Sequence, residues 1–261
     1  MVGVDRSGVA ANRPNFVTGE TLVAGLTCAL DESAARHMRV LRLACGAVVG
    51  LRDGQGNVAE GRVMRLSKSQ ALVELDAVEA VPMLPAAHLL VPVADRDRML
   101  WLAEKACELG CTSWRPVLWH RSRSVSPRGE GIVFQTKTRA RMEGALAQSE
   151  GAWIPQIFPE ASPERAMLAA PPGDRIVLDP HGEPMIGAGS TAIGAPVTIA
   201  LGPEGGFEPS EVEALVSAGF RRVRLGSTIL RFETAGIAAL AIARTALGSP
   251  RSHSPDTPLV P

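Results

Sequence analysis

The chain has 261 residues, of which 46% are hydrophobic and 21% charged, and 27 lysines and arginines balance 27 aspartates and glutamates. No apolar stretch approaches the ~20 residues of a membrane span, and no secretory signal precedes the first element, so we expect a soluble cytoplasmic protein without a membrane partner. The length suits a medium domain plus a small one. Four cysteines without metal-ligand spacing predict reduced thiols and no metal: Cys28, Cys45, Cys107 and Cys111.

Arginines are concentrated in two zones, although the net charge is zero. One lies in the N-terminal third and the other around residues 115–141. Ordinary solvated arginine explains them as readily as an RNA footprint does, because charge counts alone carry no geometry.

The first domain is expected over residues 13–82. Asp31 is the predicted cap of a short helix with Ala34, Ala35, Met38 and Leu41 on one face. The period then changes to two, with a tight turn at residues 53–56, which predicts a small β-barrel with strands at residues 48–51, 58–66 and 71–78. Residues 1–12 and 249–261 lack periodicity and are expected to be disordered.

The second domain is expected over residues 86–248, after a linker that contains Pro82 and Pro85. Apolar runs alternate with helical segments, which predicts a mostly parallel α/β sheet. A helix near Asp95 ends at Gly110, another follows Pro209, and an alanine-rich one runs from Glu233 to Leu247. The expected strands are residues 88–93, 114–119, 175–178, 197–201 and 223–225.

Ligands of such sheets bind beyond the carboxyl ends of the strands, where three loops are expected. These loops are residues 179–182, 202–206 and 225–235, the last running into the final helix. The glycines Gly202, Gly205 and Gly206 let a ligand approach the backbone closely, and Pro203 stiffens their turn.

Gly-Pro-Glu-Gly-Gly at residues 202–206, followed by Leu-Gly-x-x-Ile-Leu-Arg-x-Glu-Thr-Ala at residues 225–235, resembles the SPOUT methyltransferases. The resemblance is greatest to the family that methylates N3 of a uridine in small-subunit ribosomal RNA, the ribosomal RNA small subunit methyltransferase E family. It covers roughly residues 13–247 and includes the motifs Lys105–Gly110, Arg121–Ser122, Gln148–Ser149 with Ile154–Pro155, and His37–Arg42 with Asp53–Gly54. The chain lacks two basic residues usual in that family, near Gln148 and near Asp95.

The resemblance implies a PUA-like RNA-binding β-barrel followed by a SPOUT α/β domain with a deep trefoil knot. It implies a homodimer that acts on 16S ribosomal RNA with S-adenosylmethionine as methyl donor. The implied cofactor site comprises Leu178, Leu201, Gly202, Pro203, Glu204, Gly205, Gly206, Leu225, Gly226, Ile229, Leu230, Thr234 and Ala235. The implied RNA-binding residues are Arg13, Arg36, Arg39, Arg42 and Arg121.

Uridine N3 carries a proton, so its methylation requires a base or cations that stabilise charge on O2 and O4. Arg231 and Arg121 are the candidates for the electrostatic role, and Glu233 is the candidate base. Each has a structural alternative: Glu233 as a partner of the helix dipole, and Arg231 as the ion-pair partner of a glutamate. Glu204 is interpreted more readily as a turn-stabilising residue than as a cofactor ligand.

Two other functions remain open. The same fold can act on transfer RNA or on another atom, or the chain can be an RNA-binding assembly factor that keeps the pocket without turnover.

Overall fold

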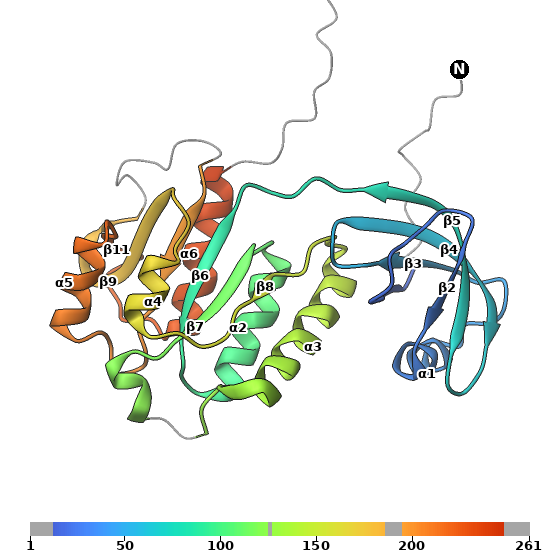
Figure 1. Ribbon diagram of the computed structural model, residues 1–261, viewed down its shortest axis with the longest axis horizontal. Helices are drawn as coiled ribbons and strands as arrows, with labels where there is room; N and C mark the ends of the chain where they lie inside the picture. Colours follow the sequence, from blue (N-terminus) through green and yellow to red (C-terminus); the bar gives the residue numbers. More distant parts are fainter. Residues whose placement is uncertain (1–12, 125–126, 186–194, 248–261) are drawn as a thin grey trace, which may run out of the picture. The chain divides into compact units, whose positions relative to one another are not determined.

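The computed structural model describes residues 13–124, 127–185 and 195–247 (Figure 1). The chain divides into two units, one with residues up to Val81 plus Glu143–Ile154, the other with Pro82–Met142 and the residues from Pro155 onward. None of the helices in these ranges is long and apolar enough to cross a membrane. The two expected disordered tails, residues 1–12 and 249–261, lie outside the described residues.

The first unit contains a five-stranded sheet with the strand order β1-β3-β4-β5-β2. The predicted strands β3, β4 and β5 are present, and two short strands that were not expected pair with β3 and β5. Strands of three or four residues are too short for an alternating pattern to stand out in the sequence. The elements are β1 (Asn15–Val17), β2 (Thr27–Leu30), α1 (Glu32–Val40), β3 (Val48–Arg52), β4 (Asn57–Leu66) and β5 (Ala71–Ala80).

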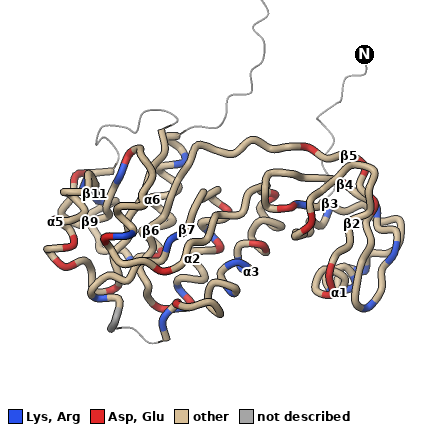
Figure 2. Tube along the Cα trace, viewed as in Figure 1, with Lys and Arg blue, Asp and Glu red and all other residues tan. Residues whose placement is uncertain are grey.

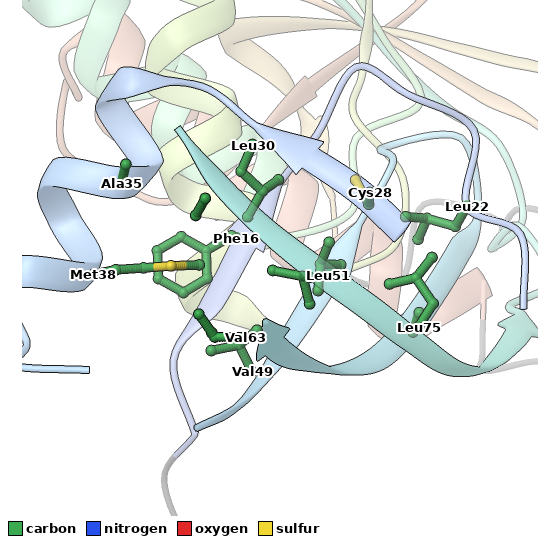
Figure 3. Close-up of a cluster of buried hydrophobic side chains, with 13 residues drawn as sticks. Phe16, Leu22, Cys28, Leu30, Ala35, Met38, Val49, Leu51, Val63 and Leu75 are labelled. Carbon is green, nitrogen blue, oxygen red and sulfur yellow. The ribbon is translucent and has the colours of Figure 1, made fainter. Parts of the chain in front are cut away.

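Helix α1 closes the core of this sheet (Figure 3). Asp31 caps the helix as predicted, its side chain accepting a 2.9 Å hydrogen bond from the backbone N–H of Ala34. Met38 is fully buried among Phe16, Leu51 and other strand side chains, whereas the arginines of the helix lie on its exposed face. The apolar periodicity of the helix therefore determines which of its side chains meet solvent.

Residues 143–154 belong to the first unit although some 60 residues of the second separate them from Val81. The predicted turn at residues 53–56 pairs with them: Ile154 N–H donates to Gly54 O and Gly56 N–H donates to Ala152 O, both at 2.9 Å. Trp153 Nε1 also donates to Val81 O at 2.9 Å. Long-range backbone pairing of this kind leaves no periodic signal in the sequence.

The second unit is built on a six-stranded sheet with the order β11-β9-β10-β6-β7-β8, and every pair in it is parallel. Its strands are β6 (Ala87–Pro92), β7 (Ser113–Val117), β8 (Gln156–Ile157), β9 (Asp174–Pro184), β10 (Val197–Ala200) and β11 (Arg221–Arg224). Its helices are α2 (Arg96–Glu108), η1 (His120–Ser124), α3 (Gly131–Ser149, ending in the first unit), α4 (Pro163–Leu168), α5 (Pro209–Ser217) and α6 (Phe232–Leu247). The predicted parallel α/β sheet is confirmed.

Helices cover both faces of this sheet (Figure 1). Ala166 of α4 and Leu215 of α5 pack in one core cluster with Trp119 and Val177. On the other face, α6 packs against α2, β6 and β10. In the centre of the sheet, Ile199 of β10 lies in register with Ile176 of β9 and Leu89 of β6.

Both ends of α2 carry the expected local signals. The side chain of Asp95 accepts hydrogen bonds from the backbone N–H groups of Asp97 and Arg98, and Gly110, just beyond the helix, has a φ of +69°. Arg244 of α6 then caps the carboxyl end, donating to Leu109 O at 3.1 Å and also to Gly110 O and Pro85 O. A cation there is favourable because helix carbonyls give this end a partial negative charge.

Residues 179–182, predicted as a loop, fall within the bounds of strand β9, but they form a bulge opposite β11, because the pairing jumps from Val177–Arg222 to Glu183–Val223. Val223 and Arg224 of β11 pair with Glu183 and Pro184, after a shift in register. A Cβ atom on Gly182 would lie 2.5 Å from the backbone of Arg222, so the strands pass too closely there for any side chain. Asp179 is buried and bonded to Arg222 Nε at 2.8 Å.

Candidate active site

The parallel strands of the second unit bring their carboxyl ends to one edge of the sheet. The segments that leave β6, β10 and β11 there are residues 93–95, 201–208 and 225–231. The candidate site is built from these segments and from the first turns of α2 and α6.

The segment after β10 forms a tight turn. Gly206 N–H donates to Pro203 O at 2.8 Å, and Gly206 has a φ of +73°, which glycine adopts without strain. The other two glycines of the turn leave space that neighbouring side chains occupy: a Cβ on Gly202 would lie 3.0 Å from the ring of Phe207, and one on Gly205 would lie 3.1 Å from Arg121. The turn is thus packed from both sides.

Arg121 holds this turn in place. Its Nη1 donates to Gly205 O at 2.5 Å and its Nε donates to Glu208 Oε1 at 2.8 Å. The hydrogen bond from Arg121, more than its charge, lowers the pKa of the Glu208 carboxyl. Glu208 also forms a capping box with Glu211 at the start of α5, so the turn and the helix are fixed together.

The segment after β11 has backbone N–H groups that can donate hydrogen bonds to a ligand. Among the described residues, none accepts a hydrogen bond from the backbone N–H groups of residues 226–230. A Cβ on Gly226 would have no atom within 4 Å, and Ile229 is 87% exposed. Backbone donors, an open glycine and aliphatic side chains are the groups that nucleoside sites combine.

Glu233 is the buried charge of the site. Its side chain lies in the first turn of α6 with 6% of its surface exposed, and Oε2 has no hydrogen-bond partner among the described residues. Arg98 of α2 lies beside it, with Nε 3.9 Å from Oε1. The Nη1 of Arg98 lies 3.8 Å from Glu204 Oε1 of the glycine turn, so one guanidinium stands between two carboxylates.

Arg98 and Glu233 line an open groove of about 610 Å³. The lining residues are Asp97, Arg98, Trp101, Ile229, Leu230, Arg231, Glu233 and Thr234. Arg231 is exposed and forms no ion pair with a described residue, and Trp101 keeps 46% of its surface accessible. The groove therefore offers two cations, two carboxylates and an aromatic face.

Comparison with known proteins identifies the family. The family model described as "RNA methyltransferase domain" matches residues 82–244, and the "RNA methyltransferase PUA domain" model matches residues 30–76. The chain belongs to the RNA methyltransferase family. It is 30% identical, over 78% of this chain and 67% of the relative, to the ribosomal RNA small subunit methyltransferase E of Synechocystis. The corresponding protein of Mycobacterium bovis is 27% identical, over 83% of this chain and 85% of the relative.

Solved structures of rRNA methyltransferases are also similar to this chain. The crystal structure of the ribosomal RNA small subunit methyltransferase E of Neisseria gonorrhoeae, bound to S-adenosyl methionine, has a TM-score of 0.77 and 28% identity, covering 89% of this chain and 97% of that one. A probable rRNA-methyltransferase of Porphyromonas gingivalis has a TM-score of 0.73 and 26% identity, covering 90% and 98%. The expected combination of a PUA-like domain and an α/β methyltransferase domain is confirmed.

Within this family's fold, the groove brings together five of the residues singled out from the sequence: Ile229, Leu230, Arg231, Glu233 and Thr234. Glu204 approaches them through Arg98. Leu225 and Gly226 lie in the same segment, and Ala235 follows in α6.

Other expected site residues do not line the groove. Leu201 and Pro203 are buried, and Leu178 lies within β9. Arg121 lies against the glycine turn. In the first unit, Arg13, Arg36, Arg39 and Arg42 are exposed, although Arg13 pairs with Glu60 and Arg36 with Glu32. Figure 2 marks acidic residues among the basic ones of this unit.

Sequence reasoning missed Asp97, Arg98 and Trp101. They lie in the first two turns of α2, directly beyond the carboxyl end of β6. That position was the available signal, because the first helical turn after such a strand faces the ligand edge of the sheet.

Proposed function

We propose that the protein transfers a methyl group from S-adenosylmethionine to N3 of a uridine in the 16S ribosomal RNA of the small subunit. The observation that carries the proposal is the buried carboxylate of Glu233, which lines one groove together with Arg98, Arg231 and the aliphatic side chains of Ile229 and Leu230. The family membership supplies the reaction class.

The residues present fit the cofactor. The backbone N–H groups of residues 226–230 are available as donors, and a ligand can approach Gly226 closely, because a Cβ there would meet no atom within 4 Å. Leu225, Ile229 and Leu230 provide aliphatic contacts. The family resemblance alone assigns Gly202, Pro203, Glu204, Gly205 and Gly206 to the cofactor site, since none of them lines the groove. S-adenosylmethionine supplies an activated methyl group, so the protein needs no further electrophile.

The chain's own residues prepare the nucleophile. Glu233 accepts the N3 proton as the N3 lone pair forms the bond to the methyl carbon, and the carbon–sulfur bond breaks toward sulfur. The Arg231 guanidinium stabilises the negative charge that develops on O2 and O4. Glu233 returns the proton to solvent after product release. We assign Arg121 to holding the glycine turn in place and not to stabilising charge on the uridine.

The first unit is proposed to bind RNA through phosphates. Arg36, Arg39 and Arg42 are exposed on and just after α1, and Arg13 precedes β1. Such contacts position a substrate without reading its sequence. We propose the domain boundaries 13–82 and 86–248 for the RNA-binding and methyltransferase functions, and a cytoplasmic location where ribosomal subunits are available.

We further expect a homodimer and a trefoil knot. Trp101 and Ile229 are large exposed apolar side chains at the rim of the groove, which favours a second copy packing there. The knot is supported by the strand order, in which β9 lies between β11 and β10, and by the packing of the last helix on β6 and β10. Analytical ultracentrifugation tests the dimer.

The deciding experiment incubates the protein and labelled S-adenosylmethionine with small ribosomal subunits from a strain lacking the enzyme. Mass spectrometry of the RNA should find 3-methyluridine at one position. Glu233→Gln should lower kcat by about 10²–10⁴-fold, as for loss of a general base. Glu213→Gln, at an exposed position on α5, is the matched control and should be fully active.

The two alternative functions predict different outcomes of this experiment. Label in bulk transfer RNA, or another methylated atom, would show a different substrate. Cofactor binding by calorimetry without incorporation into any RNA would indicate an RNA-binding assembly factor.

A further inference from the structure

Arg98 occupies an unusual position for a helix-surface arginine. Its side chain is 35% exposed, and its two nearest carboxylates come from different segments: Glu204 at 3.8 Å and Glu233 at 3.9 Å. Both distances exceed hydrogen-bonding range, so the guanidinium is shared between the carboxylates rather than bonded to one of them.

The two carboxylates differ in their need for a cation. Glu204 keeps 26% of its side-chain surface in solvent and also accepts a 3.4 Å hydrogen bond from Asp95 N–H. Glu233 is almost fully buried and has no hydrogen bond to Oε2 from a described residue. A buried carboxylate is strongly disfavoured in its charged form unless an opposite charge lies near, so Arg98 matters most to Glu233.

The other charged groups around Glu233 cannot replace Arg98. Asp97 has the wrong sign, and Arg231 is exposed without an ion pair to a described residue. The N-terminus of α6 contributes a favourable partial charge, which is weaker than a full cation.

We propose that Arg98 is a positioning residue for methyl transfer: its guanidinium, next to Oε1, holds the buried Glu233 carboxylate in the orientation in which it lines the groove and accepts the proton of the pyrimidine N3–H. This inference rests on the proposed function. Because Arg98 also contacts Glu204, it links the glycine turn to the first turn of α6. A change in the glycine turn or in the first turn of α6 then alters the orientation of the Glu233 carboxylate.

The test compares Arg98→Met, which keeps the length of the side chain without its charge, with Arg98→Lys, which keeps the charge. With small ribosomal subunits as substrate, Arg98→Met should lower kcat by roughly 10- to 100-fold, the cost typical of a misplaced catalytic group. KM for subunits and the cofactor Kd should change less than about 3-fold, because the binding surfaces remain. Arg98→Lys, which keeps a cation beside Glu233, should recover most of kcat.

A double-variant cycle gives the sharpest readout. If Arg98 acts through Glu233, Arg98→Met should lower kcat less than about 2-fold in a Glu233→Gln background. Arg165→Met, an exposed arginine of α4 outside the groove, is the control and should be fully active.

The outcomes separate this role from the reaction itself. An active wild type with an equally active Arg98→Met, or with fully additive losses in the double variant, would overturn the role of Arg98 alone. A wild-type protein that methylates no RNA would overturn the proposed function and this role with it. If Arg98→Met fails to fold, Arg98→Lys decides: a kcat close to that of the wild type with an unchanged cofactor Kd supports the role, and any larger loss of kcat opposes it.

Discussion

Arg121 Nε donates a 2.8 Å hydrogen bond to Glu208 Oε1, and the same guanidinium reaches Gly205 O, so one side chain ties the glycine turn to the start of α5. We therefore expect Arg121→Met to weaken S-adenosylmethionine binding about tenfold, as measured by calorimetry, because the turn loses its restraint. Arg121→Lys should recover little, since an ammonium cannot donate in this fork geometry. An unchanged Kd with a much lower kcat would instead favour the electrostatic role that the sequence indicated.

A substitution at Gly226 should impair cofactor binding without affecting folding. A Cβ there meets no atom within 4 Å, so Gly226→Val should leave the melting temperature nearly unchanged while raising the cofactor Kd more than about tenfold. Gly19→Val, which also projects into open space, is the matched control and should bind normally. Normal cofactor binding by Gly226→Val would place the adenosyl group elsewhere.

Arg231 should act on the transition state. Its replacement by alanine removes charge stabilisation at the pyrimidine oxygens, so kcat should fall by about 10²–10³-fold while the cofactor Kd changes little. Single-turnover methyl transfer and calorimetry measure the two quantities. Equal losses in both would assign Arg231 to the cofactor instead.

Arg42 should lower the stability of the protein while contributing to its affinity for RNA. It has a φ of +58°, a left-handed conformation that costs a non-glycine residue energy. Arg42→Gly should raise the free energy of unfolding by up to about 1 kcal/mol and flatten the salt dependence of RNA affinity by about one unit of slope. Arg42→Ala loses the same charge without relieving strain, so it should weaken binding without stabilising; stabilisation by alanine would refute the strain argument.

His88 should make the stability of the protein depend on pH. Burial, and then the charge of Arg244, lower the pKa of its imidazole from the usual 6.5, and its Nδ1 lies 2.7 Å from Ser113 Oγ. In the unfolded chain this histidine protonates near pH 6.5, while the folded protein keeps it neutral. Stability is therefore complete above pH 6.5 and falls as the pH drops below it, by at most about 1.4 kcal/mol per pH unit.

Urea titrations between pH 5.5 and 7.5 measure this slope. His88→Asn should flatten it relative to the wild type, whereas His181→Asn, at an exposed position, should leave it unchanged. Identical slopes for the wild type and His88→Asn would contradict the prediction.

The sequence by itself determined the features that depend on neighbouring residues. Asp31 and Asp95 mark helix starts because a cap needs one side-chain oxygen near the first N–H groups, and Gly110 marks an end because glycine accepts a left-handed conformation. The order of apolar segments predicted the parallel sheet, and the motifs at residues 202–206 and 225–235 pointed to the family.

Only the tertiary structure decided how distant segments meet. Residues 143–154 join the first unit through backbone pairing with the turn at residues 53–56, and residues 178–182 bulge from β9 because its pairing with β11 skips from Val177 to Glu183. Arg98 lies between Glu204 and Glu233 because three parallel strands end at one edge of the sheet. The closeness of side chains more than a hundred residues apart depends on strand order and register, which no local pattern encodes.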